Sequence, residues 1–305
     1  MRHLCSLFDL TGAEVLEILA LAKDLKAQLT HGQRPLLFER KTLALVFEKP
    51  SLRTRTSFEV AAIQLGGGST FQTAKDAGLN GRESVSDIAR VMSSYTDAIA
   101  LRTFSQTLID DFAANSSSPI INALSDSRHP CQALTDLLTM QEVYGQLEGL
   151  SLVYVGDGNN VAASLAIASA MVGIRLTIAA PDGYQLDDDL LNAIRVRYPS
   201  TELQQVGDPS QAVRHANVVY TDVWASMGQE SEANDRSRVF SSFQVNAELM
   251  ALAPDDCRFM HDLPARRGLE VTEDVIDGPN SIVFQQAENR MHLAKALLAW
   301  LMSRD

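Results

Sequence analysis

Short apolar runs alternate with stretches of helical periodicity along most of this chain. The run TLALVFE at 42–48 is typical of a buried strand, and six later runs share its pattern: 97–103, 119–124, 150–156, 175–181, 217–223 and 258–264. Between the runs, apolar residues recur every three or four positions, as in Val15, Ile18 and Leu19 after the capping box Thr11–Glu14. Strands that alternate with helices predict parallel sheets covered on both faces.

Longer helical patterns separate these runs. SFEVAAIQL, starting at Ser57, predicts a helix that ends at the glycines 66–68, after which we expect a loop. The pattern at 129–147 opens with a proline in its first turn, and a final helix covers about 285–302. The polar stretch 226–238 is typical of a mobile loop over a binding site.

A length of 305 residues suits two domains of ordinary size. We predict an α/β protein with two doubly wound parallel-sheet domains joined by interdomain helices. The first domain would cover about 1–135, completed by the C-terminal helix at 285–305, and the second would cover about 150–283. Open parallel sheets bind ligands beyond the carboxyl ends of their strands. Most of the unusual polar residues in this sequence fall at such ends.

Charge and composition exclude several classes of protein. The chain has 26 basic and 38 acidic residues, and its net charge of -12 disfavours nucleic acid and anionic membrane as partners. No apolar run approaches the ~18 residues of a membrane span, and the start lacks an apolar signal core, so we expect a cytoplasmic protein. The three cysteines are widely spaced and predict neither a disulfide framework nor a zinc site.

The segment FEKPSLRTRTSFEV at 47–60 is the first candidate site. Ser51, Arg53 and Thr54 stand in a short loop between a predicted strand and a predicted helix. A helix N-terminus offers free N–H groups to an anion, and arginine adds a planar fork that suits phosphate. A capped helix start with surface arginines is the structural alternative. The glycines and the lysine of a P-loop are missing.

Other polar positions follow later strands. Arg102 ends an apolar strand and needs an anionic partner or an exit to solvent. His129 and Gln132 begin a helix and could both address one carbonyl oxygen, although a lone histidine is more often structural. Arg290 lies on the last helix, where a solvated face is the alternative.

Two features of the second half concern specific chemistry. The turn GDGNN at 156–160 resembles a dinucleotide fingerprint, so an NAD-dependent dehydrogenase is one alternative. Against it, Asn159 and Asn160 place side chains where a bound pyrophosphate needs bare backbone.

Asp222 and Asp262 each follow a predicted strand. If those strands are neighbours, the two carboxylates come close, repulsion raises one pKa, and an ammonium group is attracted. Loop capping by each aspartate is the alternative.

Five ordered segments together resemble the transcarbamoylase family over nearly the whole chain, most closely its ornithine-specific branch. They are FEKPSLRTRTSFEV, SRHPCQALTDLLT, GDGNNVAAS, DVWASMGQE and the FMHDLPARRG segment with the later QAENRMH. The resemblance implies transfer of the carbamoyl group of carbamoyl phosphate to the δ-amine of L-ornithine, giving citrulline and phosphate in arginine biosynthesis. It also implies a homotrimer or a multiple of trimers, with no metal and no organic cofactor.

The resemblance also assigns residues. Catalytic roles fall to Arg53, Arg102, His129, Asp222, Asp262 and Arg290. Carbamoyl phosphate would be bound by Ser51, Leu52, Arg53, Thr54, Arg102, His129, Pro130, Cys131, Gln132, Asp262, Leu263 and Arg290. Ornithine would be bound by Asn160, Asp222, Ser226 and Met227.

Three departures from the family pattern bear on the substrate. Leu52 replaces the usual threonine, as in relatives that act on N-acylated ornithine. Asp262 replaces a cysteine, and a carboxylate donates no hydrogen bond unless it is protonated. Gly78 stands roughly where ornithine enzymes place a glutamine or histidine that reaches a neighbouring subunit's phosphate, and Lys75 is the candidate replacement. A sibling enzyme acting on acylornithine or putrescine and a catalytically silent paralogue therefore remain alternatives.

Overall fold

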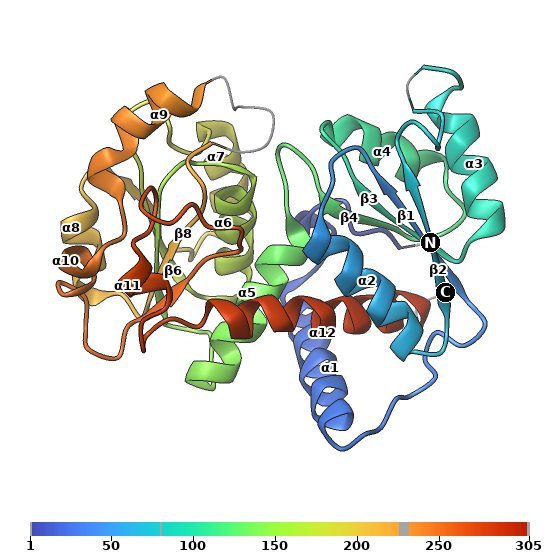
Figure 1. Ribbon diagram of the computed structural model, residues 1–305, viewed down its shortest axis with the longest axis horizontal. Coiled ribbons are helices and arrows are strands. Elements are labelled where there is room, and N and C mark those ends of the chain that lie inside the picture. Colours follow the sequence, from blue (N-terminus) through green and yellow to red (C-terminus); the bar gives the residue numbers. More distant parts are fainter. Residues whose placement is uncertain (1, 80, 226–231, 304–305) are drawn as a thin grey trace. The chain divides into compact units, whose positions relative to one another are not determined.

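The computed structural model describes residues 2–79, 81–225 and 232–303 (Figure 1). The chain divides into two compact units, Met1–Leu138 with Glu288–Asp305, and Thr139–Ala287. Each unit contains one sheet, and every strand pair in both sheets is parallel. The predicted fold class is therefore confirmed. No helix in the described part of the chain is long and apolar enough to span a membrane.

The first unit is built on a four-stranded sheet in the order β2-β1-β3-β4. The strands are β1 (Thr42–Phe47), β2 (Gly68–Thr73), β3 (Ala98–Arg102) and β4 (Ile120–Leu124). The helical elements are η1 (Leu7–Asp9), α1 (Gly12–Thr30), α2 (Leu52–Gln64), α3 (Val85–Tyr95) and α4 (Gln106–Asn115), together with the parts of α5 (Pro130–Tyr144) and α12 (Val283–Met302) that belong to this unit.

The second unit is built on a five-stranded sheet in the order β7-β6-β5-β8-β9. The strands are β5 (Ser151–Val155), β6 (Arg175–Ala179), β7 (Leu203–Val206), β8 (Val218–Thr221) and β9 (Arg258–Met260). The helical elements are α6 (Asn160–Val172), α7 (Asp188–Arg197), α8 (Pro209–Ala212), η2 (Val213–His215), α9 (Ala233–Val239), η4 (Phe240–Phe243), α10 (Ala247–Met250) and α11 (Glu273–Ile276).

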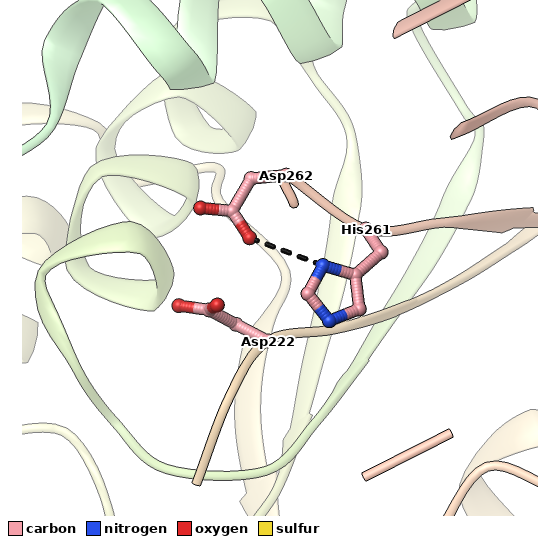
Figure 2. Close-up of side chains that lie close together, drawn as sticks. All are labelled: Asp222, His261 and Asp262. Carbon is pink, nitrogen blue, oxygen red and sulfur yellow. Dashed lines mark ion pairs between the residues drawn. The ribbon is translucent and has the colours of Figure 1, made fainter. Parts of the chain in front are cut away.

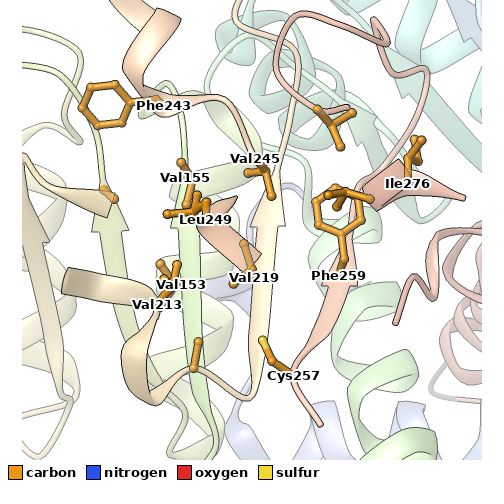
Figure 3. Packing of buried hydrophobic residues seen from close by; sticks show 14 of the residues in the cluster. Val153, Val155, Val213, Val219, Phe243, Val245, Leu249, Cys257, Phe259 and Ile276 are labelled. Atoms are coloured by element: carbon orange, nitrogen blue, oxygen red, sulfur yellow. The ribbon is translucent and has the colours of Figure 1, made fainter. Parts of the chain in front are cut away.

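Each sheet is buried against helices, which explains the continuous apolar strands. In the first unit, Ala44 and Val46 of β1 pack with residues of α3 and α4, among them Ile88 and Phe112. In the second unit, Val153 and Val155 of β5 pack with Val219, Phe243 and Phe259 (Figure 3). Burying a large aliphatic side chain stabilises the fold by about 1.5–3 kcal/mol, so these layers hold the strand ends in place.

All seven predicted strands are present, but the sequence reading missed two others. The loop expected after the glycines 66–68 is wrong, because Gly68–Thr73 pairs with β1 as strand β2. Strand β7 was also missed. Both lie at sheet edges and read GSTFQT and LQQV, with half-exposed or exposed positions. An edge strand needs no continuous apolar run, so the pattern that identifies central strands is absent.

The loop expected at 226–238 is wrong in its second half. Residues 226–231 lie outside the described residues, while Ala233–Val239 form helix α9. Arg236 on α9 is buried, and its guanidinium donates to Asp157 Oδ2 at 2.7 Å and to the carbonyl oxygen of Trp224 at 2.9 Å. Polar composition predicted a loop because it does not reveal that a charged side chain is buried in an ion pair.

Candidate active site

The residues predicted to bind an anion lie directly after β1, at the N-terminus of α2. Ser51 is the N-cap, and its hydroxyl oxygen accepts from the backbone N–H of Thr54 at 3.2 Å. The Ser51 hydroxyl also donates to Thr54 Oγ1 at 2.9 Å. The side chain of Leu52 is 78% exposed, so it packs on little of its own unit. The helix start thus has the free N–H groups and partial positive charge that attract an anion.

Thr54 is the centre of this site. Its hydroxyl oxygen accepts from Arg290 Nη2 at 2.8 Å and lies 3.4 Å from Arg102 Nη1. Arg102 ends β3 and is 6% exposed, and Arg290 lies on α12. One buried hydroxyl therefore gathers two guanidinium groups from segments far apart in the sequence. Arg53 lies in the first turn of α2, half-buried.

His129 and Gln132 lie at the start of α5, as predicted, and both are buried. Gln132 Nε2 donates to Asp136 Oδ1 at 2.8 Å, which fixes the amide orientation. Among the described residues, Gln132 Oε1 has no hydrogen-bond partner, so it is available to accept from an N–H group of a ligand. The Cys131 thiol donates to the Asn122 carbonyl oxygen, and burial raises its pKa to about 12. The thiol is therefore neutral at neutral pH and is engaged within the first unit.

Lys49 is a buried cation that the sequence reading did not single out. It is 8% exposed and stands two positions before Ser51. Its ammonium nitrogen lies 4.2 Å from the centre of the Phe104 ring, and Phe104 N–H donates to Glu48 Oε2 at 2.7 Å. A lysine beside Ser51 in an acidic chain was the available signal. Lys49 adds positive charge at the same sheet edge, and the aromatic face attracts its ammonium group.

In the second unit, an acidic cluster follows β8 and β9. These strands are neighbours, as the aspartate hypothesis required. The cluster consists of Asp222, His261 and Asp262 (Figure 2). One carboxylate oxygen of each aspartate and one ring nitrogen of His261 lie within 4.8 Å of one another. Asp262 Oδ1 lies 3.3 Å from His261 Nδ1. The predicted proximity of the two carboxylates is therefore confirmed.

Asn159 holds Asp222 in place and was missed as a functional residue. It is the N-cap of α6, where its Oδ1 accepts from the backbone N–H groups of Val161 and Ala162. Its Nδ2 donates to Asp222 Oδ2 at 2.7 Å, and the Val223 N–H donates to Asp222 Oδ1 at 2.7 Å. Both carboxylate oxygens of Asp222 therefore already accept a hydrogen bond.

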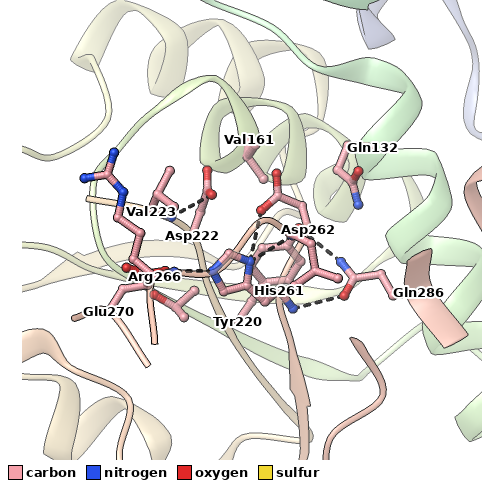
Figure 4. Close-up of polar contacts among 12 residues, drawn as sticks. Gln132, Val161, Tyr220, Asp222, Val223, His261, Asp262, Arg266, Glu270 and Gln286 are labelled. Atoms are coloured by element: carbon pink, nitrogen blue, oxygen red, sulfur yellow. Dashed lines mark hydrogen bonds and ion pairs between the residues drawn. The ribbon is translucent and has the colours of Figure 1, made fainter. Parts of the chain in front are cut away.

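Buried hydrogen bonds also fix the orientation of His261 (Figure 4). Its backbone N–H donates to Gln286 Oε1 at 3.0 Å, and Gln286 Nε2 donates to the Tyr220 hydroxyl at 3.1 Å. The ring Nε2 lies 3.3 Å from Glu270 Oε1, and Nδ1 accepts from the Leu263 N–H at 2.9 Å. The predicted residue Leu263 therefore acts on the cluster through its backbone.

The cluster binds protons more tightly than isolated side chains would. Burial first, and then the charge of Asp262, raise the pKa of Asp222 well above its usual value. Burial lowers the pKa of His261, but hydrogen bonds to Asp262 and Glu270 and the charges of Asp262 and Asp222 outweigh it and raise that pKa to about 9. At neutral pH the cluster therefore retains a proton that solvent-exposed carboxylates would have lost.

The spacing of these three residues is small enough for a cation, but their hydrogen bonds argue against one. His261 Nδ1 already accepts from a backbone N–H, and each Asp222 oxygen accepts from an N–H donor. A metal ion at His261 Nδ1 would have to displace the Leu263 N–H from the single lone pair of that nitrogen. We therefore assign no metal site to the cluster.

The turn GDGNN does not have the form of a dinucleotide site. A Cβ on Gly158 would lie 2.6 Å from Gln185 C and Leu186 N, so this glycine permits a close backbone approach within the unit. The Asn159 side chain occupies the first N–H groups of α6, which a pyrophosphate would need. Asn160 is the first residue of α6, whereas Ser226 and Met227 lie outside the described residues.

Each of the two parallel-sheet units thus contains one polar cluster, with arginines gathered at a helix N-terminus in the first and buried acidic groups in the second. Residues 2–142 match the family described as aspartate/ornithine carbamoyltransferase, carbamoyl-P binding domain. Residues 148–301 match the family described as aspartate/ornithine carbamoyltransferase, Asp/Orn binding domain. The chain belongs to the aspartate/ornithine carbamoyltransferase family.

Named relatives place the chain near one branch of that family. It is 48% identical over 303 residues to the ornithine carbamoyltransferase of Pyrococcus abyssi, covering 99% of this chain and 96% of the relative. It is 46% identical over 299 residues to that of Bacillus subtilis, covering 97% and 92%. The solved ornithine carbamoyltransferase of Pyrococcus furiosus matches with a TM-score of 0.95 at 47% identity, covering 99% of this chain and 97% of that one.

Proposed function

We propose that this protein transfers the carbamoyl group of carbamoyl phosphate to the δ-amine of L-ornithine, giving citrulline and phosphate. The observation that carries the proposal is the Thr54 hydroxyl, which gathers Arg290 and Arg102 at the N-terminus of α2. This arrangement suits a dianionic phosphate, and the similarity to ornithine carbamoyltransferases over nearly the whole chain supports ornithine as the acceptor.

The first unit would bind the donor substrate. Its phosphate would accept hydrogen bonds from the first turn of α2, with charge neutralised by Arg53 and Arg102. The carbamoyl group would meet the start of α5 and Arg290, with Gln132 Oε1 accepting from the carbamoyl amide. The proposed donor site comprises Ser51, Leu52, Arg53, Thr54, Arg102, His129, Pro130, Cys131, Gln132, Asp262, Leu263 and Arg290.

The second unit would bind the amino acid through Asn160, Asp222, Ser226 and Met227. Asp222 would hold the δ-ammonium group and accept its proton, since only the uncharged amine can attack the carbamoyl carbon. The attack places negative charge on the carbamoyl oxygen and the departing phosphate. His129, Arg102 and Arg290 would stabilise that charge, and no organic or metal cofactor is needed for such a step.

We further propose a cytoplasmic homotrimer, or a multiple of trimers, that acts in arginine biosynthesis. Similarity to a Pyrococcus furiosus enzyme named as the anabolic ornithine carbamoyltransferase, 48% identical over 303 residues, supports the biosynthetic role. Sedimentation equilibrium of the purified protein tests the assembly. A monomer at all concentrations would contradict it.

The decisive assay measures citrulline and phosphate release from carbamoyl phosphate with one amine at a time. We expect L-ornithine to give the highest kcat/KM, well above N-acetylornithine and putrescine. A higher value with either of those amines would assign the protein to a sibling activity. Phosphate release with none of the three would identify a silent paralogue.

A further inference from the structure

We propose that Gln106 is a positioning residue for the proposed reaction, because its side-chain amide fixes the turn Ser125–Arg128 that leads directly into His129. The inference rests on the proposed function for its effect on turnover. The stability of the turn is a property of the ligand-free first unit, so it can be tested without any substrate.

Gln106 is held at the carboxyl edge of the first sheet. It is the half-buried first residue of α4, which begins shortly after β3 ends. The N-cap Ser105 accepts at its hydroxyl oxygen from the Thr107 N–H at 3.1 Å, and the Thr103 hydroxyl donates to the Ser105 carbonyl oxygen at 2.9 Å. Because β3 and β4 are parallel neighbours, the turn after β4 lies at the same edge as this helix start.

Four hydrogen bonds determine the orientation of the Gln106 amide. Its Oε1 accepts from the Ser125 hydroxyl at 2.6 Å and from Asn122 Nδ2 at 3.0 Å. Its Nε2 donates to Asp110 Oδ1 at 3.0 Å and to the Cys5 carbonyl oxygen at 3.3 Å. A flipped amide would place Nε2 against the Asn122 donor and Oε1 against two acceptors. The observed orientation is therefore the one that satisfies every neighbour.

Ser125 connects this amide to the turn. The Ser125 N–H donates to the Arg128 carbonyl oxygen at 2.8 Å, and the Arg128 N–H donates to Ser125 Oγ at 3.1 Å. A hydroxyl has one proton, and Gln106 Oε1 is its nearer acceptor, since the Arg128 carbonyl oxygen lies 3.4 Å away. Ser125 is fully buried, so loss of this acceptor is costly. Gln106 thus ties both the hydroxyl and the turn that it closes to α4.

Asn122 provides a second connection, on the other side of His129. Asn122 is fully buried on β4, where Gln106 accepts from its side chain. Its carbonyl oxygen accepts from the Cys131 thiol at 3.3 Å, in the first turn of α5. His129 lies between the turn and Cys131, and Gln132 follows directly. The segment that presents both candidate side chains is therefore held from two sides by groups that bind Gln106.

Hydrogen exchange of the ligand-free protein, followed by mass spectrometry, tests the structural part of the proposal. Gln106→Leu removes all four hydrogen bonds and keeps a side chain of similar size. We expect the amides of residues 125–129 to exchange about fivefold faster or more, the size expected for loss of one neutral hydrogen bond.

Gln28→Leu is the matched control, because Gln28 Nε2 also donates to an aspartate on its own helix, Asp24, at 2.7 Å. Exchange at 125–129 should be unchanged in this variant. Unchanged exchange in Gln106→Leu, or the same acceleration in both variants, overturns the proposal. A wild-type protein that forms no citrulline would refute the proposed function and leave this measurement valid.

Steady-state kinetics test the effect on turnover. We expect kcat in Gln106→Leu to fall about tenfold or more per folded protein, because a misplacement of about 1 Å can cost about 10²-fold. The inhibition constant of inorganic phosphate against carbamoyl phosphate should stay within about twofold, since Thr54, Arg102 and Arg290 do not depend on the turn. An unchanged kcat, or a phosphate constant that rises with the loss of kcat, contradicts a positioning role.

A double-mutant cycle shows whether Gln106 acts through Ser125. Ser125→Ala removes the hydroxyl that donates to Gln106 Oε1. If both single variants break the same connection, the double variant should have a kcat within about threefold of Gln106→Leu alone. Losses that multiply in the double variant mean independent effects and overturn the proposal. If Gln106→Leu does not fold, Ser125→Ala undergoes the same exchange and phosphate-inhibition measurements, with the same expected outcomes.

Discussion

Replacing Thr54 by valine isolates the hydroxyl that gathers the two arginines. Thr54 is 1% exposed, and valine has nearly the same shape but a methyl group in place of the hydroxyl. The Thr54 hydroxyl oxygen accepts from Arg290 Nη2 at 2.8 Å and from the Ser51 hydroxyl at 2.9 Å. The hydrogen bond from Arg102 Nη1 is long, at 3.4 Å, and therefore contributes less than the other two. The Thr54→Val variant therefore mainly loses one hydrogen bond from a charged group, Arg290, and one from a neutral group, Ser51.

The two lost bonds should affect different measurements. A hydrogen bond to a charged group contributes about 1.5–3 kcal/mol, and a neutral one about 1 kcal/mol. The Arg290 bond positions a guanidinium for the substrate, so its loss should lower kcat/KM for carbamoyl phosphate by about 10- to 150-fold, at 1.4 kcal/mol for each factor of ten. The Ser51 bond helps to cap α2, so its loss should lower the free energy of unfolding by about 1 kcal/mol.

Thr54→Ser is the matched control, because it keeps the oxygen and removes only a methyl group. We expect its kcat/KM for carbamoyl phosphate to stay within about threefold of wild type, with a stability loss of about 1 kcal/mol. Steady-state kinetics with ornithine saturating, alongside urea unfolding, separate the two effects. If the valine and serine variants have the same kcat/KM, the hydroxyl does not organise the anion site and the proposed arrangement of Arg290 is wrong.

Three further predictions concern groups elsewhere in the two units. Phe104→Ala should weaken carbamoyl phosphate binding several-fold in direct titration, since the cation–π contact with Lys49 contributes about 0.5–2 kcal/mol, whereas Phe104→Tyr should preserve binding. Burial first, and then the charges of nearby lysines, lower the pKa of His292 to about 4, below its value in the unfolded chain. The contribution of neutral His292 to the free energy of unfolding should therefore be fully present above about pH 6.5. It should fall by up to about 3 kcal/mol as the pH drops to about 4. Denaturant titrations across that range should show less dependence in His292→Gln, and an unchanged slope would contradict the assignment. Gly158→Ala should destabilise by about 1–3 kcal/mol, because its Cβ would lie 2.6 Å from the Leu186 backbone, whereas Gly207→Ala, with nothing within 4 Å, should cost little.

Apolar patterning was sufficient to predict the central strands and the edge strands β4 and β9, but it missed the edge strands β2 and β7. β1 and β5 are buried on both faces, so each reads as a continuous apolar run. β2 and β7 are stabilised largely by backbone pairing with one neighbour, and a sequence such as GSTFQT carries no such run. Backbone pairing depends little on side-chain type, so a pattern of apolar side chains does not reveal it.

Residue type predicted which chemistry the site contains but not how its members interact. Ser51, Arg53 and Thr54 suggested an anion site because of their residue types and their place between a predicted strand and a predicted helix. That Thr54 accepts from Arg290 depends on α12 packing beside α2 within the first unit, 236 positions along the chain. The role of Asn159 was missed, because the sequence indicated only that its side chain would obstruct a pyrophosphate. In the structure Asn159 caps α6 and donates a hydrogen bond that orients Asp222.

The departures at Leu52 and Asp262 have different consequences in the structure. Leu52 points its side chain outward, 78% exposed, so its change from threonine leaves the Thr54 hydrogen bonds and the helix N–H groups unaltered. Asp262 stands against buried His261 and Asp222, where a change of charge must be balanced by the position of a proton. Leu52→Thr should therefore alter kcat/KM for carbamoyl phosphate modestly and leave its pH dependence unchanged, whereas Asp262→Cys should shift the pH dependence of kcat/KM for ornithine. A shifted pH dependence of kcat/KM in Leu52→Thr, or an unshifted one in Asp262→Cys, would contradict these separate roles of the two positions.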